Sequence, residues 1–125
     1  MENNFDNRLA MIGETIKDIK LIVNDYDKDE LVVSLLNGRV FKIWDDGQCC
    51  CENRYMRTDD KLEEYIGAII LKIEIADGVN TETEDGDLHQ IQFLRIHTNE
   101  GIIVFSNHNE HNGCYGGFDV EIKEV

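Results

Sequence analysis

The sequence predicts a mainly β, α+β domain: an antiparallel, rolled or barrel-like sheet of about eight strands with one short helix. Apolar and polar residues alternate along several short segments, which is typical of strands with one buried face. An Asn-Gly pair at residues 37–38 and an Asp-Gly pair at 46–47 are strong signals for hairpin turns. Apolar residues at helical spacing occur in a short segment after Thr58.

The chain is expected to begin with a short helical turn over residues 8–11 and to enter its first strand at Thr15. In that strand Ile19, Leu21 and Val23 alternate with their neighbours, and both faces are partly apolar. A polar, aspartate-rich turn should end the strand.

A hairpin is expected next, because two apolar runs, residues 31–36 and 40–44, flank the Asn-Gly pair. A type I′ turn needs positive φ at both central residues, and Asn-Gly tolerates this best. A turn of this type would place Leu35 opposite Val40.

The Asp-Gly pair at 46–47 predicts a second tight turn, after which a strand over residues 48–56 returns beside the preceding one. A helix of about two turns should then begin near Thr58, whose hydroxyl can cap it. Gly67 is in the position where a helix commonly ends.

The C-terminal half alternates strands with polar turns. We expect strands over residues 69–75, 88–98, 102–107 and 118–123. The acidic stretch 77–87 is expected to be a loop. Hairpin links make the sheet antiparallel, and the last strand should lie near an edge.

Residues 107–118 form the most informative segment, because two of the four histidines lie there among asparagine, glycine and aromatic residues. With so many hydrogen-bonding groups and so little aliphatic side chain, the segment is expected to lie outside the core. Its glycines would let it wrap a polar ligand. A second polar cluster, residues 49–60, interrupts the strand pattern. We expect the two clusters to meet in one recess.

The two clusters supply the candidate ligand-binding residues. Arginine offers a rigid fork of donors for phosphate or carboxylate, tyrosine can stack on a base, and asparagine and histidine supply hydrogen bonds. The predicted ligand is therefore small, anionic and nucleotide-like. An alternative role for Arg54 is an ion pair with Glu52 or Asp59. The candidates are Arg54, Tyr55, Arg57, His108, Asn109, His111, Asn112 and Tyr115.

Cysteine and histidine residues also raise the possibility of a zinc site, with Cys49, Cys51, His108 and His111 as candidate ligands. Zinc sites usually separate their cysteines by about two to four residues. The chain has no C-x-x-C motif, and a cysteine in a β core is most often a small buried hydrophobe. We therefore expect no metal and no other cofactor.

Catalysis is the remaining alternative, with Cys50 or Cys51 as nucleophile and a histidine of the 107–118 segment as base. The chain carries no nucleophile elbow, no phosphate loop and no metalloprotease helix, so we assign no catalytic residue. His89 and His97 lie inside a predicted strand and are expected to be structural.

Length and charge limit the function further. The 125 residues are expected to form a single domain, residues 1–125. A net charge of −14 argues against nucleic acid and anionic lipid as partners. No apolar run reaches the roughly 20 residues of a membrane span. The N-terminus does not have the pattern of a secretory signal, so a cytoplasmic location is expected.

Four motifs together resemble a family of small proteins encoded by bacteriophages and prophages, over about residues 12–120. They are Trp-Asp-Asp-Gly-Gln at 44–48, Cys-Cys-Glu-Asn-Arg-Tyr-Met at 50–56, Thr-Asp-Asp at 58–60, and His-Asn-Glu-His-Asn-Gly at 108–113 with Tyr-Gly-Gly-Phe at 115–118. Cys114 departs from the pattern, which has an aromatic residue there. The resemblance implies a phage accessory protein that acts in the bacterial cytoplasm, where such proteins often disarm host immunity.

The leading functional hypothesis is a non-enzymatic homo-oligomer that sequesters a nucleotide-type immune signalling molecule. The first alternative is an acidic inhibitor that docks on a basic groove of a host defence protein, as anti-CRISPR proteins do. The second is a metal-dependent or cysteine enzyme.

Overall fold

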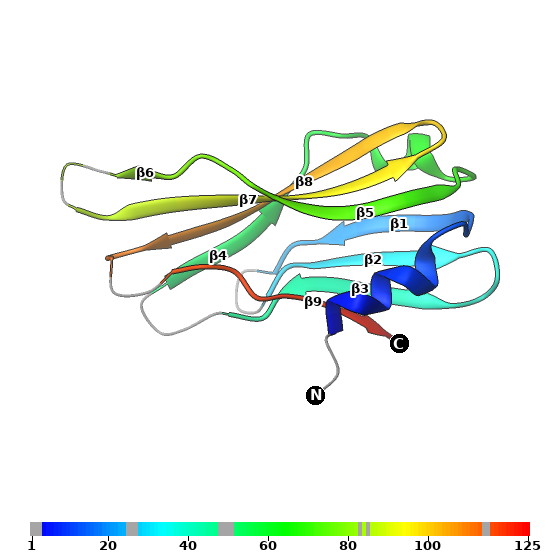
Figure 1. Ribbon diagram of the computed structural model, residues 1–125, viewed down its shortest axis with the longest axis horizontal. Coiled ribbons are helices and arrows are strands. Elements are labelled where there is room, and N and C mark those ends of the chain that lie inside the picture. The colour runs from blue at the N-terminus through cyan, green and yellow to red at the C-terminus, as the bar shows by residue number, and fades with distance from the viewer. Residues whose placement is uncertain (1–3, 25–27, 48–51, 83, 85, 114–115) are drawn as a thin grey trace.

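In a computed structural model, the structure describes residues 4–24, 28–47, 52–82, 84, 86–113 and 116–125. Its strands form two antiparallel sheets that lie face to face (Figure 1). The mainly β prediction is therefore confirmed. The first sheet has the order β1 (Ile16–Ile22), β2 (Glu30–Leu35), β3 (Val40–Asp45) and β9 (Val120–Glu124). The second has the order β4 (Glu52–Arg57), β8 (Gly101–His111), β7 (Leu88–Thr98) and β5 (Ile70–Asp77), and β6 (Thr81–Glu82) also pairs with β7.

One hydrophobic core fills the space between the sheets. Leu31 and Phe41 reach it from the first sheet, and Leu94 and Phe105 reach it from the second. Met11 closes it from the 3-10 helix η1 (Asn4–Met11), which packs beside β9. Burial of these side chains, at about 25 cal/mol per Å² of apolar surface, is the main force that holds the sheets together.

Backbone hydrogen bonds join the two sheets along one side. Gly13 N donates to Ile70 O over 2.7 Å, and Ile16 N donates to Ala68 O over 2.9 Å. On the other side, Met56 N of β4 donates to the buried carboxylate of Asp29, which directly precedes β2. The strands belong to two antiparallel sheets rather than to one continuous rolled or barrel-like sheet.

Several expected elements are confirmed. Residues 8–11 belong to η1, the long strand 88–98 has the predicted bounds, and β9 lies at the edge of its sheet. Gly67 ends the segment after Thr58 with φ of +93°. That segment is one 3-10 turn, η2 (Leu62–Tyr65), rather than a two-turn α-helix, because so short an α-helix would not repay its nucleation.

The predicted hairpin register is wrong by one residue. Val40 lies opposite Ser34 rather than Leu35. Gly38 has φ of +93°, but Asn37 does not have positive φ, so the turn is not type I′. Leu35 N donates to Arg39 O, which closes a longer loop with a left-handed glycine near its end.

The strand expected beside β3 after residues 46–47 is not there. β9 takes that place, with Ile122 opposite Ile43 and Asp119 O accepting from Asp46 N. The chain instead crosses to the second sheet, where β4 pairs with β8. Burial of Ile122 against the core favours this long-range pair over the local hairpin. The cysteines at 49–51 lie outside the described residues.

In the described part of the chain, no helix has the length and apolar character that crossing a membrane requires.

Candidate functional site on the outer face of β4 and β8

The two polar clusters do meet, because β4 and β8 are antiparallel neighbours. Tyr55 lies opposite His108, and Arg54 lies opposite Asn109. Successive side chains of a strand point to opposite faces, however, so the clusters are divided between two faces of the sheet. The two clusters do share one open hollow of about 430 Å³, lined by Gly47, Glu52, Arg54, Gly116, Gly117, Phe118 and Asp119. Of the predicted ligand-binding residues that the structure describes, only Arg54 lines it, so the expected recess is present without the other candidates.

The predicted site residues separate into two sets. Arg54, Asn109 and His111 lie on the inner face, which packs against the other sheet. On the outer face lie Tyr55, Arg57 and His108. Asn112 follows β8 and is exposed, and Tyr115 lies outside the described residues.

Arg54 is part of the interior. Its side chain is 6% exposed and bonds both Asp45, 2.9 Å away, and Glu52, which are themselves buried. The Nη1 atom also donates to Gly117 O over 2.9 Å. Burial lowers the pKa of Arg54, but the two carboxylates more than offset this, and the pKa is raised overall. The alternative role expected for Arg54, an ion pair with Glu52 or Asp59, is confirmed for Glu52. The second carboxylate that pairs with it is Asp45 rather than Asp59.

The remaining inner residues hold the chain after β8 against the sheet. Asn109 Nδ2 donates to Glu52 over 2.9 Å. His111 Nδ1 accepts from Gly113 N, so its Nε2 carries the proton and donates to Gln90 Oε1 over 3.1 Å. The first five residues of the 107–118 segment are thus strand, and alternate side chains among them are interior, contrary to the expectation. Mutual hydrogen bonds make this burial possible.

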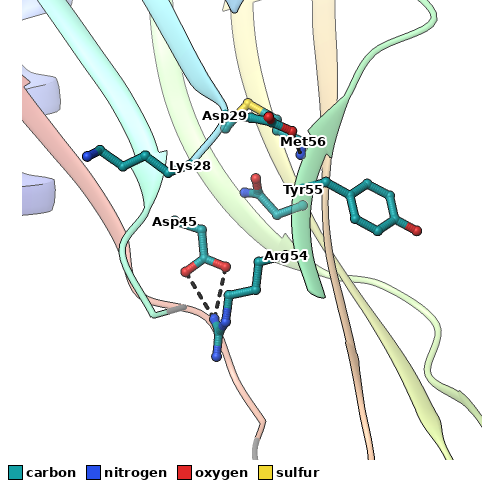
Figure 2. Close-up of a pocket in the computed structure, with 7 residues that line it drawn as sticks. Lys28, Asp29, Asp45, Arg54, Tyr55 and Met56 are labelled. Carbon is teal, nitrogen blue, oxygen red and sulfur yellow. Dashed lines mark hydrogen bonds and ion pairs between the residues drawn. The ribbon is translucent and has the colours of Figure 1, made fainter. Parts of the chain in front are cut away.

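A small cavity of about 20 Å³ lies beside Arg54, between the sheets (Figure 2). Asn107, 1% exposed, lines it, and both polar ends of its amide have no partner among the described residues. The volume suits one water molecule and not a nucleotide. In Figure 2 the Tyr55 ring points away from this cavity, toward the other face of the sheet.

Tyr55, Arg57 and His108 form the outer cluster. The Tyr55 and His108 rings are stacked, with centroids 4.6 Å apart and planes within 6° of each other. The guanidinium of Arg57 lies 4.9 Å from the centre of the Tyr55 ring. Nη1 of Arg57 donates to Asp29 over 2.9 Å and to Met56 O over 2.7 Å. The side chain is 50% exposed, and no described residue accepts a hydrogen bond from its Nε or Nη2.

His108 connects this cluster to Ser106 and to His89, which was expected to be structural rather than part of a site. Its Nδ1 lies 2.8 Å from His89 Nε2, and its Nε2 lies 2.8 Å from Ser106 Oγ. Burial lowers the pKa of His108, and the nearby charges of His89 and Arg57 lower it further. Burial also raises the pKa of Tyr55. At neutral pH His108 is therefore an uncharged imidazole.

A hollow of about 210 Å³ opens beside the outer cluster. It contains the Arg57 guanidinium, two hydroxyls and a phenyl ring together with the carboxylates of Asp59 and Asp60, so Arg57 is the one residue of its described lining that attracts an anion. It is smaller than most whole-ligand sites, so it would take part of a ligand. The lining residues are Arg57, Thr58, Asp59, Asp60, Phe93, Val104 and Ser106.

Residues 9–121 match the family model described as a domain of unknown function, DUF7448. The chain belongs to this family. No curated protein and no solved structure matches it. The family region contains β1 to β8 and both polar clusters, so the outer cluster is part of the DUF7448 domain itself.

Sequence reasoning missed His89, Phe93 and Ser106 in this DUF7448 chain. Alternation along residues 88–98 places His89 and Phe93 on one face, and Ser106 lies two positions before His108. The missing information was the pairing of β7 with β8 and of β8 with β4, which puts these faces side by side.

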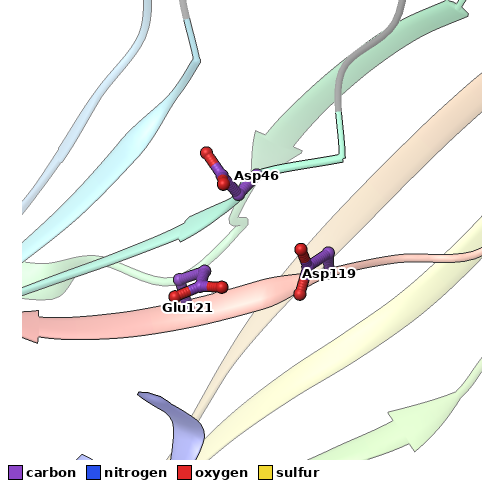
Figure 3. A group of neighbouring side chains, drawn as sticks. All are labelled: Asp46, Asp119 and Glu121. Carbon is purple, nitrogen blue, oxygen red and sulfur yellow. The ribbon is translucent and has the colours of Figure 1, made fainter. Parts of the chain in front are cut away.

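The zinc site considered from the sequence does not form as proposed, because His108 and His111 point to opposite faces of β8. A different group of acids gathers where β3 and β9 meet: Asp46, Asp119 and Glu121 (Figure 3). Burial and the neighbouring acids raise the pKa of Asp119. We assign no ligand to this group, which adds to the negative surface charge.

Proposed function

We propose that the protein is a non-enzymatic binding protein that captures a small anionic, nucleotide-type ligand on the outer face of β4 and β8. One observation carries the proposal: the half-exposed guanidinium of Arg57, stacked on Tyr55, presents Nε and Nη2 beside a hollow. Those two nitrogens have the fork geometry that matches two oxygens of a phosphate.

The neighbouring groups suit the rest of such a ligand. Phe93 lines the hollow and supplies an aromatic surface for a base, and base–aromatic stacking contributes about 1–3 kcal/mol per base. The hydroxyls of Ser106 and Thr58 also line the hollow; they already donate to backbone carbonyl oxygens, so toward a ligand they can act as hydrogen-bond acceptors. Arg54 does not bind the ligand in this proposal, because its guanidinium is already paired with two buried carboxylates.

The biological role that we propose is counter-defence. The resemblance to phage and prophage proteins supports sequestration of a nucleotide immune signal in the cytoplasm of an infected bacterium. Assembly into a homo-oligomer would multiply the sites per particle. The charge of −14 disfavours nucleic-acid backbones, which need a broad basic face, but it leaves a small ligand able to use one local arginine.

The test compares Arg57→Ala with Arg39→Ala. Arg39 is a matched control, because it also stacks on an aromatic ring, Phe41, and also pairs with an acid, Glu124, but it lies on the other sheet. Calorimetric titration with cyclic mononucleotides and cyclic dinucleotides should show at least about tenfold weaker binding for Arg57→Ala and unchanged binding for Arg39→Ala. Equal affinities in the two variants, or no binder in the panel, would contradict the proposal.

A second candidate is the acidic inhibitor that docks on a basic groove of a host defence protein. The charge of −14 and the group of Asp46, Asp119 and Glu121 favour it. Asp119→Lys would then abolish inhibition of the host protein and leave nucleotide binding intact. The enzyme alternative rests on cysteines outside the described residues.

A further inference from the structure

His89 and His108 face each other across the two longest strands of the molecule. Nε2 of His89 and Nδ1 of His108 are 2.8 Å apart. β7 and β8 each have 11 residues and pair without interruption along their length. Both rings are partly buried, and His108 is held between Tyr55 on one side and its hydrogen bonds on the other. The two nitrogens therefore stand on a rigid support.

The second nitrogen of His108 has the partner that metal-binding histidines usually have. Nε2 lies 2.8 Å from Ser106 Oγ, and Ser106 in turn donates to Arg57 O over 3.4 Å. Because Ser106 donates its own proton to Arg57 O, it accepts the proton of His108 Nε2. His108 Nδ1 then has a lone pair, which points at His89. A hydrogen bond from the distal ring nitrogen is what fixes the tautomer and orientation of metal ligands.

The spacing requires little change for a metal to enter. Zinc–nitrogen bonds are about 2.0–2.1 Å, so two imidazole nitrogens of a tetrahedral site lie about 3.3 Å apart. The rings must separate by roughly half an ångström and must also tilt, because the two hydrogen-bonded nitrogens now point at each other rather than at a shared metal position. Glu110 lies opposite His89 and two residues after His108 on the same face, and it is exposed. Its carboxylate now accepts from Asn53 Nδ2 and from the Tyr55 hydroxyl, so it must leave both partners to reach the pair.

We infer that His89 Nε2 and His108 Nδ1 bind a divalent transition-metal ion that prefers imidazole, such as Zn²⁺ or Ni²⁺, with Glu110 as the third protein ligand. Water completes the coordination. When the metal binds, the proton on His89 moves from Nε2 to Nδ1, so each ligating nitrogen offers a lone pair and the Ser106 contact is kept. The charge of −14 raises the local concentration of cations. This site goes beyond the proposed function and does not rest on it.

The experiment uses the full chain without an affinity tag, freed of metal by a chelator and then titrated with ZnCl₂ or NiCl₂. Calorimetry should show one site, and nitrogen-15 NMR with ZnCl₂ should show shifts of His89 Nε2 and His108 Nδ1. His89→Gln, which keeps a hydrogen-bonding group opposite His108, should weaken binding at least about tenfold. Glu110→Gln should weaken it less.

His97→Gln is the control, because His97 lies on the same face of β7 and pairs with Glu74 instead. It should leave the affinity unchanged. The inference is overturned if His89→Gln binds the metal as the unmodified chain does, or if the two ring nitrogens do not shift on addition of ZnCl₂. Arg57→Ala should retain the metal site, so its nucleotide result reports on the proposed function alone.

Discussion

Arg54 and Arg57 show how far neighbouring residues of one type can differ. The side chain of Arg54 is 6% exposed and that of Arg57 is 50% exposed, because they leave β4 on opposite faces. The sequence marked both as ligand-binding candidates, since residue type alone does not say which arginine meets an acid. Asp45, whose carboxylate pairs with Arg54 and keeps it from binding a ligand, comes from the other sheet.

Loss of Arg54 should destabilise the fold. Arg54→Ala leaves Asp45 and Glu52 buried without a cation, and breaking a buried ion pair typically costs about 3–5 kcal/mol. Urea unfolding measures this. Arg39→Ala removes an exposed ion pair and should change the free energy of unfolding by less than about 1 kcal/mol. A similar result for the two variants would show that Arg54 does not hold the interior together.

His108 should make stability fall with acid. Burial, His89 and Arg57 lower its pKa in the folded protein, against the raising effect of Glu110. The unfolded chain therefore takes up a proton below about pH 6.5 that the folded protein resists. In chelator-containing buffer, the free energy of unfolding should drop more steeply between pH 7 and pH 5 than in His108→Gln. If the free energy of unfolding depends on pH in the same way in both proteins, His108 does not cause the loss of stability in acid.

At the scale of elements, β8 explains what sequence reasoning could and could not find. Its first half carries Ile103 and Phe105 on the inner face and reads plainly as strand, whereas Asn107, Asn109 and His111 continue the same face with polar groups. Such a stretch resembles a loop, because its hydrogen-bonding partners lie far away in the chain, as Glu52 does from Asn109.

Turn geometry and long-range strand pairing are the other features that could not be predicted from the sequence. The hairpin at 37–38 was expected from its residue types, but its register depends on which residues adopt positive φ, and only the glycine does. The pairing of β3 with β9 joins segments some 80 residues apart, and local periodicity contains no information about it. The alternation that placed β7, by contrast, is a local property, and that strand was predicted with the observed bounds.

Asp29 should hold β4 against the first sheet through its hydrogen bonds. Its carboxylate accepts from Met56 N and from Arg57 Nη1, each over 2.9 Å. Asp29→Ala leaves a buried N–H group without a partner, which costs about 1–3 kcal/mol. Amide hydrogen exchange should speed up at Met56 more than at Leu94 in the core. Unchanged exchange at Met56 would show that β4 is held by β8 alone.

The whole molecule has one core between two sheets and a strongly negative surface. These properties make the two proposed functions respond differently to salt. Capture of a small ligand by one arginine should lose at most about threefold in affinity between 50 and 300 mM NaCl, because attraction to Arg57 and repulsion by the acidic surface are screened together. Docking of the whole acidic face on a basic protein should weaken far more steeply. Titration of each partner at both salt concentrations separates them.

The most direct measurement is a nitrogen-15 NMR titration of the full chain with cyclic mononucleotides and cyclic dinucleotides. Binding at the outer cluster predicts the largest shifts at Tyr55, Arg57 and Ser106, with Arg54 and Asn109 unchanged. Shifts centred on Arg54 and Asn109, or none anywhere with the whole panel, would contradict the assignment of ligand capture to this face.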